Sequence, residues 1–515
     1  MQSKKVALVM NPRAGQNLIK LNYIMSLFSA AGWETELEVK IYSGQTLELA
    51  REAAKRGCDL LIAYGGDGTL NYVVNGAMQA GAHTAVGVIP GGTANVWASE
   101  IGVPNDPVKA ALTLLKSIAR PVDIGRVEVA DLSFPCNSSD QQAHHQDTPK
   151  HLKQKVKMKN RARQHFLLMA GLGIDAAVMG HVSKPTKYRI GPLAVGLAAA
   201  KELPAQRPFP LELWNATKGI DTASKLLWKG EARQVVIGNT RLYAKVMSMT
   251  PEALIDDGLL DVCVITAGDP LTTFQQITSF LLHRSSEHVT AEYFQGAHIS
   301  MRVPSWVQLQ VDGSAVRLKD YLRSEDRAAL QQAENDEEST ITYHFDALPR
   351  ALSVAFPASY DDTLFEERSK AEEDHDQSGI EGAHSTAGTS QAPEEGSTAL
   401  HDQPPRREQG TPPQVELALE KGRKVTILGV SPHPTKKQTC IAAGTTPKRR
   451  TGEETPVAVV FDEQTKILTS TGEPTSLGTL QRVPEGAEIV VVGKKNKRGV
   501  IAAKQAVIEL PVPAR

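Results

Sequence analysis

This sequence has few cysteines, few aromatic side chains and no long apolar segment, and each shortage excludes a class of protein. Its 4 cysteines among 515 residues have neither the density of a disulfide framework nor the spacing of a zinc site. No apolar stretch reaches the roughly 18–20 residues that cross a bilayer as a helix. The apolar run near the N-terminus is too short for a signal peptide. We therefore expect a cytoplasmic protein without a transmembrane segment.

An excess of one charge is also missing, and so are two common nucleotide-binding signatures. The formal net charge is -1, so no global field attracts nucleic acid, and we expect no nucleic-acid partner. No GxxxxGK[ST] stretch occurs, which excludes a P-loop. Gly171 and Gly173 follow an apolar run as in a dinucleotide-binding fingerprint, but no acidic residue lies about 20 positions further on to hold a ribose.

Three apolar runs instead end directly in polar or glycine-rich loops that open a helical pattern. The three segments are residues 60–76 with the loop Gly65-Gly66-Asp67-Gly68, residues 84–102 with Gly91-Gly92-Thr93, and residues 6–15 with Asn11, Pro12 and Gly15. Glycines let a backbone approach closely, and a helix start offers unpaired N–H groups and a positive dipole end. In a parallel sheet the three loops meet at one edge, where ligands bind. The pattern predicts a phosphate or nucleotide site, although one such loop alone is equally a plain tight turn.

The composition and the hydrophobic pattern change three times along the chain, and these changes predict four regions. Strand and helix patterns alternate first, short strands follow, then an acidic stretch rich in Ser, Gly, Thr and Pro, and finally short strands with Gly and Pro turns. The regions are an α/β nucleotide-binding domain at 1–121, a mostly-β second domain at 122–350 with a basic polar insertion at 131–164, a disordered acidic linker at 351–414, and a small OB-like β-barrel at 415–515.

Two of these regions leave alternatives open. The insertion holds 7 Lys or Arg and no acidic residue between Lys150 and Arg163. It is therefore either a solvated loop or a patch that attracts anionic lipid head groups. The barrel has few aromatic residues on which bases could stack, so we lean toward a structural or regulatory role for it.

The order and spacing of the motifs resemble the diacylglycerol kinase catalytic-domain family, which includes bacterial lipid kinases and sphingosine kinases. The matching stretches within about residues 3–350 are Asn11-Pro12-x-x-Gly15, Gly65-Gly66-Asp67-Gly68-Thr69-Leu70-Asn71, Gly91-Gly92-Thr93-Ala94-Asn95, Val122-Asp123-Ile124-Gly125, Ala170-Gly171-x-Gly173-x-Asp175-Ala176, Asp256-Asp257-Gly258-Leu259-Leu260-Asp261 and Asp312-Gly313. The resemblance implies a three-layer α/β domain like that of NAD kinase and phosphofructokinase, followed by a β-sandwich-like domain. It also implies a cleft between them where ATP meets the hydroxyl of a lipid.

The resemblance further implies roles for single residues. Those implied for ATP are Asn11, Gly65, Gly66, Asp67, Gly68, Thr69, Leu70, Asn71, Gly92, Thr93 and Asn95. Asp67 and Asp312 are implied as catalytic, and Asp123, Asp257 and the carbonyl of Leu259 as ligands of Mg²⁺, an ion that takes oxygen ligands. Simpler alternatives stay open, with Asp67 as a helix cap and Asp123 and the Asp-Asp-Gly stretch as turn residues.

The sequence departs from the family at the residue assigned as the base. Bacterial members carry Glu after the Asp-Gly pair, whereas this chain carries Ser314, which cannot take a proton near neutral pH. Asp67 or Asp312 then takes that role, or activity is reduced. We expect an ATP- and Mg²⁺-dependent lipid kinase that meets its substrate peripherally at the inner membrane face. An NAD kinase-like enzyme, a nucleotide-binding scaffold without catalysis, and a homodimer stay open.

Overall fold

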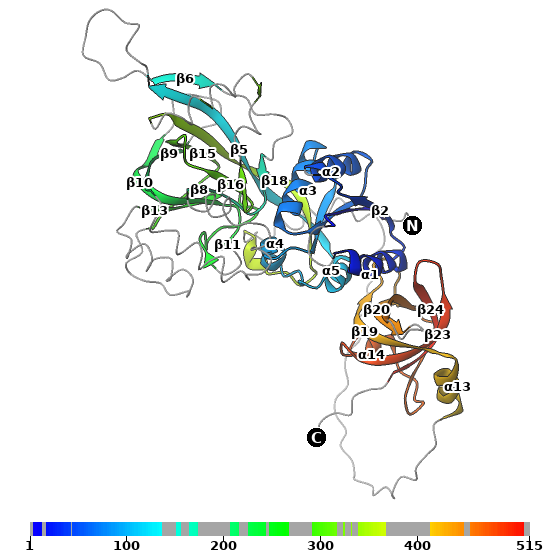
Figure 1. Cartoon of the computed structure of the whole chain (residues 1–515). Helices are drawn as coiled ribbons and strands as arrows, with labels where there is room; N and C mark the ends of the chain where they lie inside the picture. The colour runs from blue at the N-terminus through cyan, green and yellow to red at the C-terminus, as the bar shows by residue number, and fades with distance from the viewer. Residues whose placement is uncertain are drawn as a thin grey trace, which may run out of the picture.

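The structure is a computed structural model, and Figure 1 shows its three parts in a row, with an α/β domain between a larger β domain and a small barrel. The residues it describes are 4–12, 17–42, 44–135, 151–155, 164–173, 207–215, 225–243, 247–266, 291–316, 323–324, 331, 338–366, 412–447 and 454–508. Within these ranges, no helix combines the length and the apolar character that a bilayer crossing requires.

The α/β domain has three layers, as predicted. Its sheet is parallel in the order β4-β3-β1-β2, and the strands are β1 (Lys5–Met10), β2 (Glu34–Val39), β3 (Leu60–Gly65) and β4 (Ala85–Pro90). The helices are α1 (Asn17–Ala30), α2 (Gln45–Lys55), α3 (Asp67–Gln79), α4 (Val96–Glu100) and α5 (Pro107–Leu114). Helices α2 and α3 cover one face, and α1 and α5 cover the other. All six residues of β3 are buried, as expected for a central parallel strand with helices on both faces.

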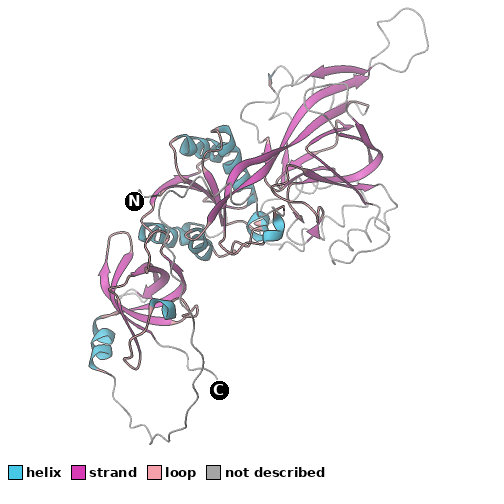
Figure 2. Cartoon of the chain, turned by 180° about the vertical axis from the view of Figure 1, so that it is seen from behind, coloured by secondary structure: helices cyan, strands magenta, loops and turns pink. Residues whose placement is uncertain are grey.

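Two long strands run through both the α/β domain and the β domain. β5 (Ile118–Pro135) and β18 (Thr340–Phe356) pair antiparallel over nearly their whole length, and the end of β18 joins β4 in parallel. Figure 2 shows this ribbon leaving the helical part and entering the β domain. The predicted domain boundaries after residues 121 and 350 therefore fall inside strands. The pairing shifts register between Leu348 and Leu352, at the level where the two domains meet.

The β domain is a sandwich-like fold, as predicted. Its further strands are β6 (His151–Lys155), β7 (His165–Phe166), β8 (Met169–Gly173), β9 (Phe209–Asn215), β10 (Lys225–Gly238), β11 (Leu242–Tyr243), β12 (Met247–Ser248), β13 (Leu260–Thr266), β14 (Ala291–Gly296), β15 (His298–Pro304), β16 (Leu309–Val311) and β17 (Ser314–Val316). Alternate residues point inward, for example Phe209, Leu211 and Leu213 of β9, and form one apolar core. Of the predicted insertion, residues 131–135 belong to β5 and residues 151–155 form β6, whereas 136–150 and 156–163 lie outside the described residues.

The C-terminal part is a closed five-stranded barrel, which confirms the predicted β-barrel. Its elements are α13 (Pro413–Lys421), β19 (Arg423–Pro432), β20 (Cys440–Pro447), β21 (Glu454–Phe461), β22 (Lys466–Thr469), α14 (Leu477–Leu480), β23 (Glu488–Lys495) and β24 (Val500–Ile508). The ring order is β21-β20-β19-β23-β24, and pairing of β21 with β24 closes it. Of the predicted linker, β18 takes residues 351–356, the 3-10 helix η4 (Asp362–Leu364) follows, and residues 367–411 lie outside the described residues.

The barrel packs against helices α1 and α5 of the α/β domain (Figure 1). Ile441, Ala443, Ala458 and Val500 point out of the barrel and are buried in the same apolar cluster as Phe28 and its neighbours on α1. The residues next to them in sequence point into the barrel's own core, because strand residues alternate between faces. The outer face of β20 and β21 is therefore a docking surface, which we call the barrel junction.

Candidate active site

In the first glycine loop, a single residue separates the end of β3 from the start of α3. β3 ends at Gly65, Gly66 is the N-cap, and Asp67 is the first residue of α3. A Cβ atom on Gly65 would lie 2.4 Å from Oγ1 of Thr69, so a larger residue does not fit there. The N–H groups of Thr69 and Leu70 donate to the carbonyl of Gly66 at 2.8 and 3.1 Å. The N-terminus of α3 therefore lies directly at the carboxyl edge of the sheet.

The second glycine loop touches the first, backbone against backbone. The N–H of Gly91 donates to the carbonyl of Gly65 at 2.9 Å, and a Cβ on Gly92 would lie 2.5 Å from Cα of Gly66. Asn95, in the left-handed region at φ 49, closes this loop. Its Oδ1 accepts from the N–H of Gly92 at 2.9 Å, and its Nδ2 donates to the carbonyl of Gly92 at 3.0 Å. The side chain of Asn95 thus shapes the predicted nucleotide loop from within.

Asp67 lies between the starts of two helices. Its Oδ1 accepts from the N–H of Trp97 at 3.2 Å, in the first turn of α4. The N-cap residues of α3 and α4 make no side-chain cap hydrogen bond of their own. The sequence leaves open that Asp67 caps α3, the helix that follows it, whereas this hydrogen bond goes to α4, after the second glycine loop. The carboxylate ties the two loops together while staying half-buried at the sheet edge.

The predicted nucleotide residues gather at this edge with two exceptions. The N–H of Asn11, just after β1, donates to the carbonyl of Tyr64 at 3.2 Å, so this loop lies beside the first glycine loop. Thr93 is exposed at the tip of the second loop. Leu70 is 2% exposed and contributes to the core, so only its backbone is near the loop. Asn71 is 0% exposed, and its side chain points to the β domain.

Asp312 receives the side chain of Asn71 and three backbone N–H groups. Its Oδ2 accepts from Nδ2 of Asn71 at 2.8 Å and from the N–H of Leu167 at 3.0 Å. Its Oδ1 accepts from the N–H groups of Leu168 and Met169 at 3.0 and 3.1 Å. Burial raises the pKa of Asp312, and these four donors oppose that rise. Predicted as catalytic, this carboxyl is fully engaged inside the protein.

Ser314 lies over the start of α3. A Cβ atom added to Gly68 would be 3.6 Å from Oγ of Ser314, which begins strand β17. The position that carries Glu in bacterial members of the resembling family thus faces the first glycine loop from the β domain. The two domains meet here around Asp67, Gly68 and Ser314, and a cleft between them stays a prediction.

The residues predicted for metal binding lie at the other contact between the domains. Asp123 is 0% exposed, and its two carboxylate oxygens accept from the N–H groups of Arg350 at 2.6 Å and Gly258 at 2.5 Å. Burial raises its pKa to about 6, with Asp257 adding to the rise. Asp257 accepts from the N–H of Leu259 at 2.9 Å, and burial raises its pKa too. Asp123 is therefore satisfied by backbone donors, whereas Asp257 sits in a turn beside further carboxylates.

Asp261 was not selected as a ligand from the sequence, although it ends the same motif. Its Oδ2 is buried and finds no hydrogen-bond partner. Burial raises its pKa to about 6, and the charge of Asp257 adds to the rise. Yet the described part of the chain holds no group of three or more His, Cys, Asp or Glu that could bind a metal ion. An oxygen-seeking cation here would have to combine Asp257 and Asp261 with backbone oxygens.

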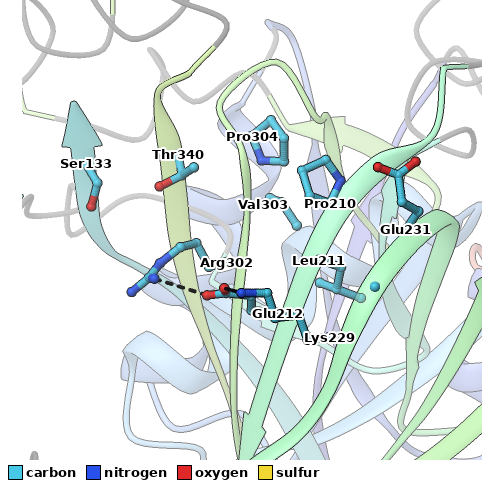
Figure 3. Close-up of a pocket in the computed structure, with 11 residues that line it drawn as sticks. Ser133, Pro210, Leu211, Glu212, Lys229, Glu231, Arg302, Val303, Pro304 and Thr340 are labelled. Carbon is cyan, nitrogen blue, oxygen red and sulfur yellow. Dashed lines mark hydrogen bonds and ion pairs between the residues drawn. The ribbon is translucent and has the colours of Figure 1, made fainter. Parts of the chain in front are cut away.

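A cavity of about 780 Å³ lies away from these residues, in the β domain (Figure 3). Strands β5, β9, β10, β15 and β18 form its walls, and Glu212 in its lining pairs with Arg302 at 3.1 Å and Lys229 at 2.9 Å. None of the residues predicted for ATP, catalysis or metal lines it. The glycine loops, rather than this cavity, are therefore the candidate active site.

Comparisons with known proteins match the two larger domains. Residues 5–127 match the diacylglycerol kinase catalytic domain, and residues 169–355 match the YegS C-terminal NAD kinase beta sandwich-like domain. The chain is 28% identical over 316 residues to a diacylglycerol kinase of Bacillus subtilis, covering 60% of this chain and 89% of the relative. It is 28% identical over 268 residues to a probable lipid kinase YegS-like of Pseudomonas aeruginosa, covering 52% and 73%.

A solved structure shows a likeness at lower identity. The crystal structure of a putative diacylglycerol kinase from Bacillus anthracis is 19% identical and has a TM-score of 0.49, covering 70% of this chain and 97% of that one. The two family matches end at residues 127 and 355, so neither reaches the barrel.

Proposed function

Because residues 5–127 match the diacylglycerol kinase catalytic domain and residues 169–355 match the second domain of YegS-like lipid kinases, we propose that the protein transfers the γ-phosphate of ATP to a lipid hydroxyl. Diacylglycerol or a sphingoid base is the proposed class of acceptor. The observation that carries the proposal is the meeting of two glycine loops, Asp67 and a residue of the β domain, Ser314, at one sheet edge. A site of this kind supports binding of phosphates on one side and of an acceptor on the other.

The phosphates of ATP are proposed to lie on the loop backbones. Gly66 and Gly92 approach each other too closely for larger side chains, so no side chain of these two residues stands between a ligand and the loop backbones. The N-terminus of α3 adds a positive dipole end. Asn11 and Thr93 flank the loops and are proposed to orient the nucleotide.

Asp67 is the proposed proton acceptor. The oxygen of the lipid hydroxyl attacks the γ-phosphorus, the bond to the bridging oxygen breaks, ADP leaves, and the hydroxyl proton passes to Asp67. Ser314 offers no carboxylate at this place, and Asp312 has four hydrogen-bond donors already. Positioning and electrostatics carry most of phosphoryl transfer, so a weaker base is compatible with activity.

Mg²⁺ is proposed at two places. One ion would accompany ATP beside the first glycine loop and neutralise charge on the phosphates. Asp257, the carbonyl of Leu259 and Asp261 would hold a structural ion, and the unpaired buried oxygen of Asp261 fits such an ion. Asp123, with both oxygens bound by backbone N–H groups, is proposed only as a neighbour of that site.

The proposed setting is the cytoplasmic face of a membrane. The chain would act on a lipid presented there and would contact the surface peripherally. A homodimer stays a prediction.

The test is transfer of labelled phosphate from ATP, with Mg²⁺, to a panel of diacylglycerol, monoacylglycerol, phosphatidylglycerol, sphingosine and ceramide in mixed micelles. We expect label on one of these lipids, and a loss of at least about 100-fold in Asp67→Asn, because its neutral amide cannot take the proton. Glu34→Gln, an exposed carboxylate at the opposite edge of the sheet, is the matched control and should leave the rate unchanged.

A nucleotide-binding scaffold is the second candidate, because Ser314 stands where a carboxylate is assigned in the family. ATP binding without label on any lipid would favour the scaffold. Activity that rises in Ser314→Glu would show that the acceptor side of the site is intact.

A further inference from the structure

We propose that Asp312, Asn71, Asn75 and His165 form a polar pin that fixes helix α3 to the β domain, and that Asp312 is a positioning residue rather than the base. The pin holds Ser314 and the acceptor side over the phosphate loop. Its catalytic consequence depends on the kinase function proposed above, whereas its structural consequence can be measured without any activity.

The helix side of the pin is one turn of α3. Asn71 and Asn75 lie four residues apart, so they share a face of the helix, and both are 0% exposed. The Nδ2 atoms of both donate to the carbonyl of His165 at 2.9 Å. Oδ1 of Asn75 accepts from the N–H of His165 at 3.0 Å and contacts its Nδ1 at 3.2 Å. Two side-chain amides of the α/β domain thus bond to one residue of the β domain.

The other side of the pin is the turn between β16 and β17. Val311 pairs with Ser314, so Asp312 and Gly313 form a two-residue hairpin turn with φ of 44 and 69. Positive φ at both central residues is the geometry for which Asp-Gly is favoured. The N–H of Gly313 donates to Oε1 of Gln310 at 2.8 Å, which holds the turn from behind. The residue that leaves this turn is Ser314, so the position of Ser314 depends on that of Asp312.

The carboxylate of Asp312 connects the two sides. Each of its oxygens accepts two hydrogen bonds, from Asn71 and from the consecutive N–H groups of residues 167–169. A carboxylate has about four acceptor positions, and all four are occupied. To take a proton from a substrate, Asp312 would have to give up one of these bonds. The geometry therefore assigns it to hold the domains in register.

The kinetic test uses Asp312→Asn, Asn75→Ala and the double variant. Either orientation of the amide introduced by Asp312→Asn brings an NH₂ group against N–H donors, and Asn75→Ala removes all three polar contacts with His165. Each single variant should lower kcat by about 10- to 100-fold, the cost of a misplacement of about 1 Å, with KM for ATP within about twofold. The double variant should lose little more than the worse single one, because both break the same pin. Asn215→Ala, an exposed asparagine of β9, is the control.

The base alternative gives the opposite pattern. If Asp312 accepted the proton, Asp312→Asn would abolish the acidic limb of the pH–rate profile, while Asn75→Ala would keep it. The two losses would then multiply in the double variant. That result would overturn the proposal.

Hydrogen exchange tests the pin without activity. The amides of Leu167, Leu168 and Met169 donate to Asp312, so they should exchange at least about 10-fold faster in Asp312→Asn, while the barrel amides stay unchanged and serve as the internal reference. Unchanged exchange at these three amides would overturn the pin. If the wild-type chain phosphorylates no lipid but these amides respond, the proposed function fails and the pin stands.

Discussion

The α/β domain meets its two neighbours in different ways. Toward the β domain, side chains hydrogen-bond across the contact, as in the pin and in Glu100, which accepts from the N–H groups of Arg241 and Leu242 at 3.2 and 3.0 Å. At the barrel junction, apolar side chains such as Ile441 and Ala443 pack on α1. The hydrogen bonds of the first contact depend on the direction of approach, whereas the apolar packing of the second does not.

The difference matches what each contact has to do. A hydrogen bond loses strength with small errors of distance and angle, so a contact made of several such bonds fixes one relative position. Apolar packing contributes free energy in proportion to buried area and tolerates small shifts. The contact beside the candidate active site therefore adds position-fixing hydrogen bonds to its apolar packing, whereas the barrel junction consists mainly of apolar packing.

The largest effect is expected from a charge in the barrel junction. Ala443 is 1% exposed, so Ala443→Glu buries a carboxylate without a partner and should weaken docking by about 3–5 kcal/mol. The measurement is size-exclusion chromatography after cleavage at a protease site inserted between residues 366 and 412. The wild-type pieces should elute together and those of Ala443→Glu apart.

Gln464→Glu is the control for this variant, since it adds the same charge at an exposed position of the barrel. Its pieces should stay together. Co-elution of the Ala443→Glu pieces would mean that another surface holds the barrel.

A smaller, pH-dependent effect is expected at Glu100, on the polar side of the comparison. Burial raises the pKa of Glu100 from 4.5 to about 7. Between these values the folded chain keeps a proton that the unfolded chain has lost, so this stabilising contribution is complete below pH 4.5 and disappears as the pH rises to about 7. The free energy of unfolding should fall by up to about 3 kcal/mol across this window.

Denaturant unfolding of the wild type and of Glu100→Gln over pH 4.5–8 measures that slope by difference. The variant should lack it, because Gln does not titrate. Asp123 and Asp261 contribute a slope of the same sign and His165 one of the opposite sign in both proteins, so the difference isolates Glu100. If the unfolding free energies of the two proteins change with pH in parallel, Glu100 does not cause the slope.

The smallest effects are expected at the rim of the barrel junction. Oγ of Ser26 donates to the carbonyl of Arg498 at 2.9 Å, and Ser26→Ala should cost about 1 kcal/mol of docking. Lys109 pairs with Glu485 at the exposed edge, and Lys109→Ala should leave docking unchanged. The cleavage assay with added urea ranks the two. If Lys109→Ala weakens docking more than Ser26→Ala does, the ion pair rather than packing and hydrogen bonding controls this rim.

The loops and strands could be predicted from the sequence because their signals are local. The Gly-Gly-Asp-Gly and Gly-Gly-Thr loops follow apolar strands, and the structure has them where expected. The partners of Asn71 and Asp312 could not be predicted, since these residues are 241 positions apart and no local pattern records the contact. Family resemblance put Asn71 at the nucleotide, whereas its amide is occupied between the domains.

The sequence also carries a local signal for the barrel junction. Residues 440–443 and 457–460 are apolar without alternation, whereas a barrel strand with one wet face should alternate. An uninterrupted run in a short strand outside a parallel sheet indicates a partner on its outer face. The sequence could not identify α1 as the helix that covers this outer face, because the two segments are far apart in the chain and no local pattern links them.

The ribbon of β5 and β18 also limits how the α/β domain and the β domain can move relative to each other. Both chain crossings between the domains are strands in one antiparallel ladder, so the domains cannot rotate about a flexible loop. Any change in the angle between the two domains must therefore bend this two-stranded ribbon. The place of least resistance is the break in pairing between Leu348 and Leu352, where Arg350 has φ 47 and its N–H is held by Asp123. The buried carboxylate of Asp123 therefore braces the ribbon at the break in its pairing, which limits bending of one domain against the other.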